Sequence, residues 1–169
     1  SAPETSVPET SAPETSAPET AEPEVTEPEF DHFDFADGSN ADNVSLDNNA
    51  GTLTFSSGAV SSDNILALLA NDDIVIKDAN GNVVTDGKIG TGSTVTSTIN
   101  GVSETVDVVV VGDVNGDGDI ASDDVLTLTS SLIYHTPLEG AYGAAADTNG
   151  DGSFTSSDIL HLALNVKGY

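Results

Sequence analysis

Two short acidic segments carry the residue types and the spacing that calcium-binding loops use. Each segment begins with Asp-x-Asn-Gly-Asp-Gly and places another Asp at the twelfth position. Side chains at positions 1, 3 and 5 of such a loop converge on one ion, and Gly at position 6 permits the sharp turn. Since carboxylate, amide and carbonyl oxygens are the hard ligands that Ca²⁺ prefers, we predict two bound calcium ions. The predicted ligands are Asp113, Asn115, Asp117, the backbone carbonyl of Asp119, and Asp124 in the first loop, and Asp147, Asn149, Asp151, the backbone carbonyl of Ser153, and Asp158 in the second.

An internal repeat relates the two loops. Aligning Asp113 with Asp147, an offset of 34 residues, makes nine of twenty positions identical. Apolar residues recur at helical spacing over residues 125–133 and again over 159–166, so one helix is predicted after each loop. Residues 106–111 are rich in valine and predict a strand rather than the entering helix of a standard EF-hand. We therefore expect each loop to be followed by one helix and preceded by none.

A small β-rich module of α+β character is predicted over residues 31–111. Asn100 and Gly101 lie between two β-branched runs, which favours a tight β-hairpin. Ser61 or Ser62 is suited to cap a short helix, because its hydroxyl can accept a hydrogen bond from a free backbone N–H. The predicted strands lie within residues 44–55, 74–76, 83–84, 94–99 and 105–111.

Residues 1–30 consist of six five-residue blocks, most of them variants of Ser-Ala-Pro-Glu-Thr. A proline in every block removes a backbone donor, and the glutamates repel one another. Large apolar side chains are almost absent, so this segment has nothing with which to build a core. We predict a disordered Pro/Glu/Thr-rich linker here, which leaves residues 112–169 as the third part of the chain.

The charge of the chain restricts its partners. The sequence has 29 Asp and Glu residues against 3 Lys and Arg residues, a formal net charge of -26. Such a chain repels phosphate backbones, which disfavours nucleic acid, and no apolar run is long enough for membrane insertion. Without Trp and with few aromatic residues, no sugar-stacking platform is expected, so carbohydrate binding is not predicted. Three scattered His residues and no Cys supply neither a zinc site nor a thiol nucleophile, and no catalytic residues are predicted.

The duplicated loop-and-helix unit, with Asp at position 12 and downstream of a Pro/Thr-rich linker, closely resembles the dockerin modules of cellulosome and amylosome components. The resemblance covers residues 112–169, and residues 31–111 loosely resemble the small X modules that accompany some dockerins. It implies an all-α dockerin with two EF-hand-like calcium-loop–helix repeats that lack the entering helix. A small α+β module would precede it.

For function, the resemblance implies calcium-dependent docking onto a cohesin module of a scaffoldin. Such docking would anchor a secreted, extracellular or cell-surface protein of polysaccharide degradation, or a further scaffold protein, in a multi-enzyme complex. The chain itself is not expected to be an enzyme, although it can be the C-terminal part of a larger, enzymatic protein. One alternative is a calcium-dependent structural module that tethers a carbohydrate-binding domain in residues 31–111. A calcium sensor or buffer is another, which the missing entering helices disfavour.

The resemblance also implies that loop positions 10 and 11, and the outer faces of the following helices, contact the cohesin. Helix capping is an alternative role for the loop positions. Asp123 and Ser157 occupy the same position in the two repeats and differ, so binding in one orientation or in two both stay open. The implied contact residues are Ser122, Asp123, Leu126, Thr129, Ser130, Ile133, Ser156, Ser157, Leu160, Ala163, Leu164 and Lys167.

Overall fold

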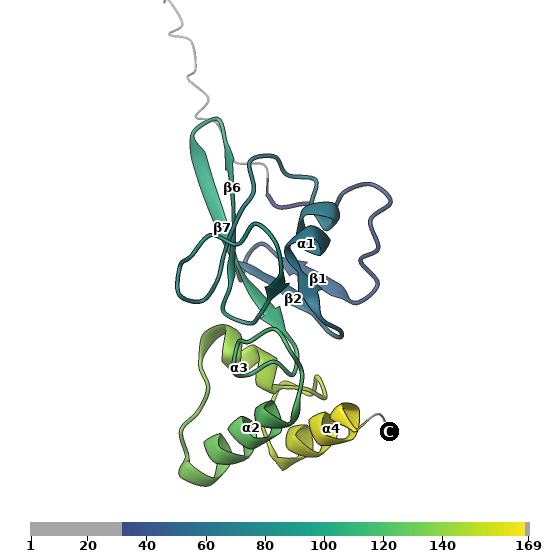
Figure 1. Ribbon diagram of the computed structural model, residues 1–169, viewed down its shortest axis with the longest axis vertical. Coiled ribbons are helices and arrows are strands. Elements are labelled where there is room, and N and C mark those ends of the chain that lie inside the picture. Colours follow the sequence, from purple (N-terminus) through teal and green to yellow (C-terminus); the bar gives the residue numbers. More distant parts are fainter. Residues whose placement is uncertain (1–31, 168–169) are drawn as a thin grey trace, which may run out of the picture.

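The computed structural model describes residues 32–167, so the linker predicted for residues 1–30 lies outside the described part. Strands predominate up to residue 110 and helices follow (Figure 1). The elements in chain order are β1 (Val44–Asp47), β2 (Thr52–Phe55), β3 (Val60–Ser61), α1 (Ser62–Leu68), β4 (Val75–Lys77), β5 (Lys88–Ile89), β6 (Thr94–Ile99), β7 (Val102–Val110), α2 (Ser122–Tyr134), α3 (Gly140–Ala146) and α4 (Ser156–Val166).

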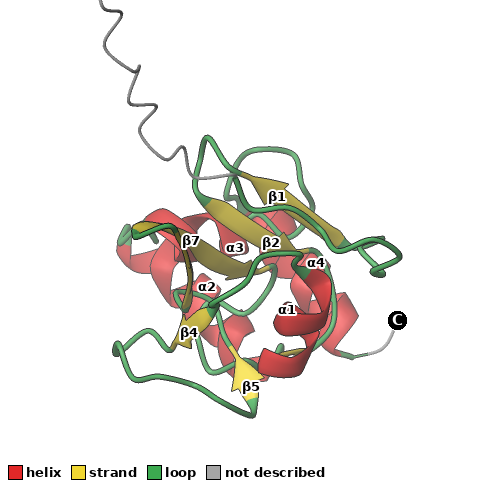
Figure 2. Cartoon of the chain, turned by 90° about the horizontal axis from the view of Figure 1, so that it is seen from above, coloured by secondary structure: helices red, strands yellow, loops and turns green. Residues whose placement is uncertain are grey.

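Strand β7 lies at the centre of a five-stranded mixed sheet with the order β1-β2-β7-β6-β4. It pairs antiparallel with β6 and parallel with β2, where Thr52 lies opposite Asp107. Strands β3 and β5 form a separate two-stranded sheet. Figure 2 shows the strands lying over the C-terminal helices. Because β7 runs directly into the first acidic loop, the middle of the sheet fixes where that loop begins.

The side chains of β7 alternate between two cores, as successive side chains of a strand point to opposite faces. Val106, Val108 and Val110 belong to the core of residues 32–110, which we call the β domain. Val109, between them, belongs to the core of residues 111–167, which we call the helical layer. One strand therefore contributes to both halves of the described structure.

Local turn and cap chemistry forms as the sequence predicts. Asn100 and Gly101 have φ angles of 53° and 83° and join β6 to β7, the backbone conformation of a two-residue hairpin loop. The hydroxyl oxygen of Ser61 accepts a hydrogen bond from the backbone N–H of Asn64 at 3.2 Å and so caps α1. These short-range predictions are confirmed.

The β domain has one core between its sheet and α1. Phe33, Leu53 and Ile65 are completely buried in it. The strand predicted at residues 83–84 is reduced to a single bridge between Lys77 and Val83.

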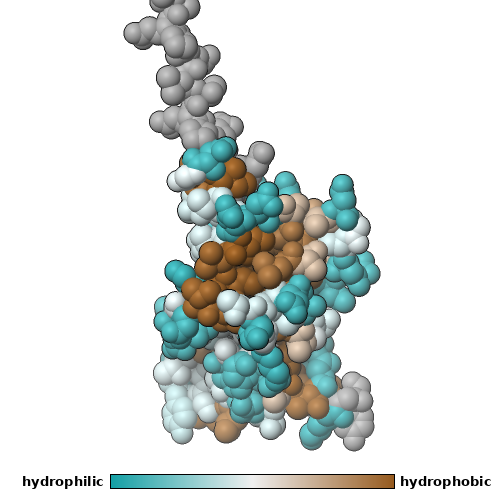
Figure 3. Space-filling view, turned by 45° about the horizontal axis from the view of Figure 1, so that its top comes forward, coloured by the Kyte–Doolittle hydropathy of each residue, from teal (hydrophilic) through white to brown (hydrophobic). Residues whose placement is uncertain are grey.

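Part of the apolar surface of the β domain stays uncovered. Figure 3 shows hydrophobic side chains gathered in a patch on this domain, whereas most of the helical layer visible from that side is hydrophilic. The exposed large apolar residues of the β domain are Leu66, Val75 and Val83.

Helices α2 and α4 pack against each other in the helical layer, and α3 packs against β7. Leu128 and Leu162, which are equivalent in the internal repeat, are both buried. Ala145 and Ala146 of α3 are buried in the same core as Val109. Within residues 32–167, no helix is long and apolar enough to cross a membrane.

The predicted fold class, an α+β module followed by an all-α dockerin, is wrong. Residues 32–110 form a β domain with a single helix of seven residues, and the core of the helical layer includes Val109 from the central strand. The second loop also has an entering helix, because α3 ends at Ala146, directly before Asp147. Two glycines and four alanines among its seven residues give α3 no large-apolar periodicity, which is why the sequence pattern missed it.

Candidate metal centre

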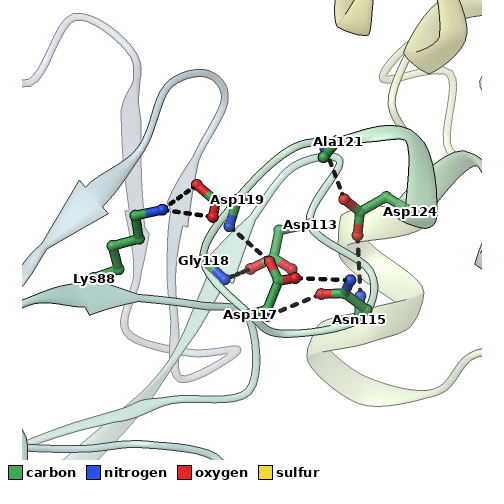
Figure 4. Close-up of polar contacts among 8 residues, drawn as sticks. All are labelled: Lys88, Asp113, Asn115, Asp117, Gly118, Asp119, Ala121 and Asp124. Carbon is green, nitrogen blue, oxygen red and sulfur yellow. Dashed lines mark hydrogen bonds and ion pairs between the residues drawn. The ribbon is translucent and has the colours of Figure 1, made fainter.

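The first acidic loop begins at Asp113, which follows shortly after the end of β7 and is completely buried. Oδ1 of Asp113 accepts a hydrogen bond from the backbone N–H of Gly116 at 2.7 Å. Its Oδ2 accepts one from the N–H of Gly118 at 3.1 Å, which Figure 4 shows. The loop backbone is therefore wrapped around this carboxylate. Gly116 and Gly118 both have φ of 80°, a left-handed conformation that glycine adopts without strain.

Asp124, at position 12, closes the loop from the start of α2. Its Oδ1 accepts hydrogen bonds from the backbone N–H groups of Val114 at 2.9 Å and Asn115 at 3.2 Å. Its Oδ2 accepts one from Ala121 at 2.9 Å, the reciprocal half of a helix capping box. One carboxylate thus joins the beginning of the loop to its end.

Between these two carboxylates, side-chain oxygens accept hydrogen bonds from backbone N–H groups two residues further along the chain. Oδ1 of Asn115 accepts from the N–H of Asp117 at 2.9 Å, and Oδ1 of Asp117 accepts from the N–H of Asp119 at 2.8 Å. The side chain of Asp119 forms an ion pair with Lys88 of the β domain. An amide or carboxylate oxygen that accepts one hydrogen bond retains a lone pair for a cation.

The second loop repeats most of these hydrogen bonds. The carboxylate of Asp147 accepts from the N–H groups of Gly150 at 2.9 Å and Gly152 at 2.8 Å, as Asp113 does in the first loop. Asp158 accepts from the N–H of Asn149 at 3.2 Å and from that of Thr155 at 2.9 Å. The sequence repeat is therefore also a structural repeat.

The buried carboxylates of the first loop carry unfavourable charge. Burial raises the pKa of Asp113 and that of Asp124, and each is held back by the backbone N–H groups that donate to it. The negative charge of Asp124 raises the pKa of Asp113 further. Among residues 32–167, no Lys or Arg forms an ion pair with either side chain. A divalent cation is the counter-charge that such a loop lacks.

The donor set fits calcium, whose ligands are oxygens. No three side chains of His, Cys, Asp or Glu within residues 32–167 gather into a metal-binding cluster by themselves. An ion in either loop would therefore also draw on the amide oxygen of Asn115 or Asn149 and on backbone carbonyls.

The helix caps adjoin the predicted cohesin contacts without being those residues. The N-cap residues are Ala121 for α2 and Thr155 for α4, so Ser122 and Ser156 are the first helical residues. The hydroxyl of Thr155 accepts a hydrogen bond from the N–H of Ser157 at 3.2 Å.

None of the twelve predicted contact residues is buried. The most exposed large side chains among them are Leu126, at 66%, Ile133, at 63%, and Leu160, at 61%. Large apolar side chains so exposed on two neighbouring helices favour a binding surface.

One residue of the site escaped the sequence analysis. The backbone N–H of Thr91, in the β domain, donates a hydrogen bond to Oδ2 of Asp113 at 2.9 Å. A backbone donor has no side-chain signature, and 22 residues separate the partners, so no sequence pattern indicates this contact.

Comparison with known proteins finds one match, which lies in the helical layer. Residues 111–166 match the dockerin type I domain family. No curated protein and no solved structure matches the chain. A dockerin domain is a non-catalytic module, and its presence implies calcium binding and calcium-dependent docking to a cohesin.

Proposed function

We propose that residues 112–169 dock this chain onto a cohesin module of a scaffoldin when both loops hold calcium. The observation that carries the proposal is the duplicated loop, closed by equivalent hydrogen bonds that Asp124 accepts from the N–H of Asn115 and Asp158 from that of Asn149. The helices that follow expose apolar side chains. Closure at position 12 sets where each helix begins. It therefore also sets where the exposed residues of α2 and α4 lie.

Calcium would be held in the first loop by Asp113, Asn115, Asp117, Asp124 and the carbonyl of Asp119. The corresponding residues of the second loop are Asp147, Asn149, Asp151, Asp158 and the carbonyl of Ser153. A bound ion supplies positive charge that offsets the carboxylates of each loop. Residues 112–169 contain nine acidic residues and one Lys, so this compensation bears on the fold of the whole module.

The recognition surface consists of the outer faces of α2 and α4. Leu126 and Leu160 are equivalent in the repeat and both exposed, so the two faces share an apolar centre. Ile133 on α2 corresponds to Lys167 after α4, which makes the faces chemically unequal. This inequality favours one binding orientation over the other for a cohesin that has a single preferred partner surface.

In the wider role that we propose, the chain anchors a secreted protein in an extracellular complex for polysaccharide degradation, of the cellulosome or amylosome type. Residues 1–30 would act as the spacer to whatever precedes them, and residues 31–111 as an X-like companion of the dockerin. The support is the order of the three segments along the chain and the contacts between the β domain and the first loop.

Calorimetric titration of the whole chain against a panel of cohesins tests this function. We expect tight binding to at least one cohesin in calcium and none after calcium is removed with a chelator. Leu126→Asp and Leu160→Asp should each weaken binding, whereas Leu66→Asp, on the exposed face of α1, should leave it unchanged. Binding that persists in chelator, or that is indifferent to Leu126 and Leu160 together, would refute the proposed docking surface.

A further inference from the structure

The two acidic loops share most of their internal hydrogen bonds but have different surroundings. Four residues at the end of β5, Lys88, Ile89, Gly90 and Thr91, lie against the first loop, and we call them the bracing segment. Figure 4 shows Lys88 reaching the carboxylate of Asp119 from the β-domain side of the loop.

Backbone packing between the bracing segment and the first loop leaves no free space. A Cβ atom on Gly90 would lie 2.6 Å from the carbonyl carbon of Gly116 and 2.8 Å from the nitrogen of Gly118. A Cβ atom on Gly116 would lie 2.8 Å from the carbonyl oxygen of Thr91. These are contacts with backbone atoms, which cannot rotate away.

No such brace lies against the second loop in the part of the chain that the structure describes. Gly150 and Gly152 occupy the positions of Gly116 and Gly118, and a Cβ atom on either would meet nothing within 4 Å. Gly118 is buried and Gly152 is exposed. Position 1 follows the same contrast, because Asp113 is buried and Asp147 is partly exposed.

The donor that reaches Asp113 is itself held in place. Thr91 is completely buried, and its hydroxyl donates to the carbonyl oxygen of Val110 at 3.1 Å while accepting from the N–H of Val110 at 3.0 Å. The N–H of Asp113 in turn donates to the carbonyl of Val110 at 2.9 Å. Donor and ligand are thus both attached to the end of the central strand.

We propose that Thr91 is a positioning residue of the first calcium site, so that the β domain makes the first loop the tighter of the two. The inference rests on the proposed binding of calcium to both loops. The Thr91 N–H holds the Asp113 carboxylate in one orientation before the ion arrives, so less conformational freedom is lost on binding. Asp147 receives its hydrogen bonds from its own loop, within residues 32–167, and gains no such help.

The direct test is a calcium titration of the calcium-stripped whole chain in chelator-buffered solutions, followed by nuclear magnetic resonance. The amides of Gly118 and Gly152 each donate to the position-1 Asp of their own loop, so each resonance reports one site. We expect the Gly118 signal to reach its calcium-bound position at a calcium concentration about tenfold lower, the smaller effect typical of an outer-shell partner. Equal filling of the loops, or earlier filling of the second, overturns the inference and leaves the docking function standing. If neither resonance responds to calcium, the proposed function and the inference fall together.

A substitution outside both loops separates bracing from loop chemistry. Gly90→Ala places a methyl group between the bracing segment and the first loop, and Gly90 lacks the positive φ that would strain alanine. We expect the affinity of the first loop to fall about tenfold or more while that of the second stays unchanged. The amide of Thr91 should lose its calcium-dependent protection against hydrogen exchange in this variant. An unchanged first-loop affinity would contradict the inference.

A matched pair within the loops guards against general misfolding. Gly116→Ala and Gly150→Ala impose the same backbone strain, since the φ angles are 80° and 74°, but only the first meets Thr91 and the side chain of Tyr142. We expect Gly116→Ala to weaken its own loop more than Gly150→Ala weakens the other. Equal losses in the two variants would mean that strain alone decides the affinity, against the inference.

Discussion

The side-chain amide of Asn115 donates a hydrogen bond from Nδ2 to Oδ2 of Asp123 at 3.0 Å, and Asn149 makes the same contact with Oγ of Ser157 at 3.2 Å. In both repeats, position 3 of the loop is therefore tied to position 11. Position 3 is a proposed calcium ligand, and position 11 is a proposed cohesin contact. An ion that fixes the Asn oxygen would thus also fix the side chain offered to the partner.

Substituting Asp at position 3 tests this link. Asn115→Asp keeps a ligand oxygen but brings two carboxylates together at Asp123, whereas Asn149→Asp faces the hydroxyl of Ser157, which can donate to it. We expect Asn115→Asp to weaken cohesin binding about tenfold, which corresponds to roughly 1.4 kcal/mol. Asn149→Asp should bind almost as the parent chain does. Calorimetric titration with a cohesin that binds the parent chain measures the affinity of each variant. Equal affinities of the two variants would argue against the link.

Removal of calcium should lower the stability of the helical layer and fray its helices. Asp113, Asp124 and Asp158 are buried there, and the cation that offsets their charge would be gone. We expect the helical circular dichroism signal of α2 and α4 to fall in chelator and to return with excess calcium. Each site should add about 2.7 kcal/mol of stability at a free calcium concentration one hundred times its Kd. A helical signal that is the same with and without chelator would show that the carboxylates need no ion.

The pH dependence of the calcium-free chain should be opposite to that of the calcium-loaded chain. Burial raises the pKa of Asp113 and Asp124 above the ordinary value of about 3.9. The folded state therefore binds more protons than the unfolded state between that value and the raised pKa, and stability falls as pH rises through this window. Acidifying the calcium-stripped protein from pH 7 toward about pH 4.5 should raise its free energy of unfolding.

With calcium present, protons compete with the ion for the same carboxylates, so acidification should lower stability instead. Urea unfolding at both pH values, with and without calcium, measures how the free energy of unfolding changes with pH in each condition. Asp124→Asn supplies the control, because an uncharged amide should flatten the slope of the calcium-free protein. The same sign of slope in both conditions would show that the loop carboxylates do not control it.

Short-range chemistry accounts for what the sequence could predict. The turn at Asn100 and Gly101 and the cap at Ser61 each depend on a few neighbouring atoms, and both form as expected. The parallel pairing of β2 with β7 joins residues about fifty positions apart and has no local signature. Val109 faces the helices only because alternation along β7 turns it away from the β domain, and an all-α interpretation of residues 112–169 overlooks it.

Adjacent valines of β7 provide a test of whether the two halves unfold together. Val108 and Val109 are both completely buried, but Val108 lies in the core of the β domain and Val109 in that of the helical layer. Val→Thr keeps the shape and buries a hydroxyl, which costs about 1–3 kcal/mol where it finds no partner. The N–H of Val111 donates to the carbonyl of Phe55 at 2.9 Å, and the Thr91 N–H donates to Asp113, so these two hydrogen bonds connect the halves. We therefore expect Val108→Thr and Val109→Thr to lower the temperature of one shared unfolding transition of the calcium-loaded protein by similar amounts.

Calorimetric melting of the parent and both variants measures these transition temperatures. Two separate transitions, each lowered by only one substitution, would show that the β domain and the helical layer unfold independently, and that the bracing segment does not join them.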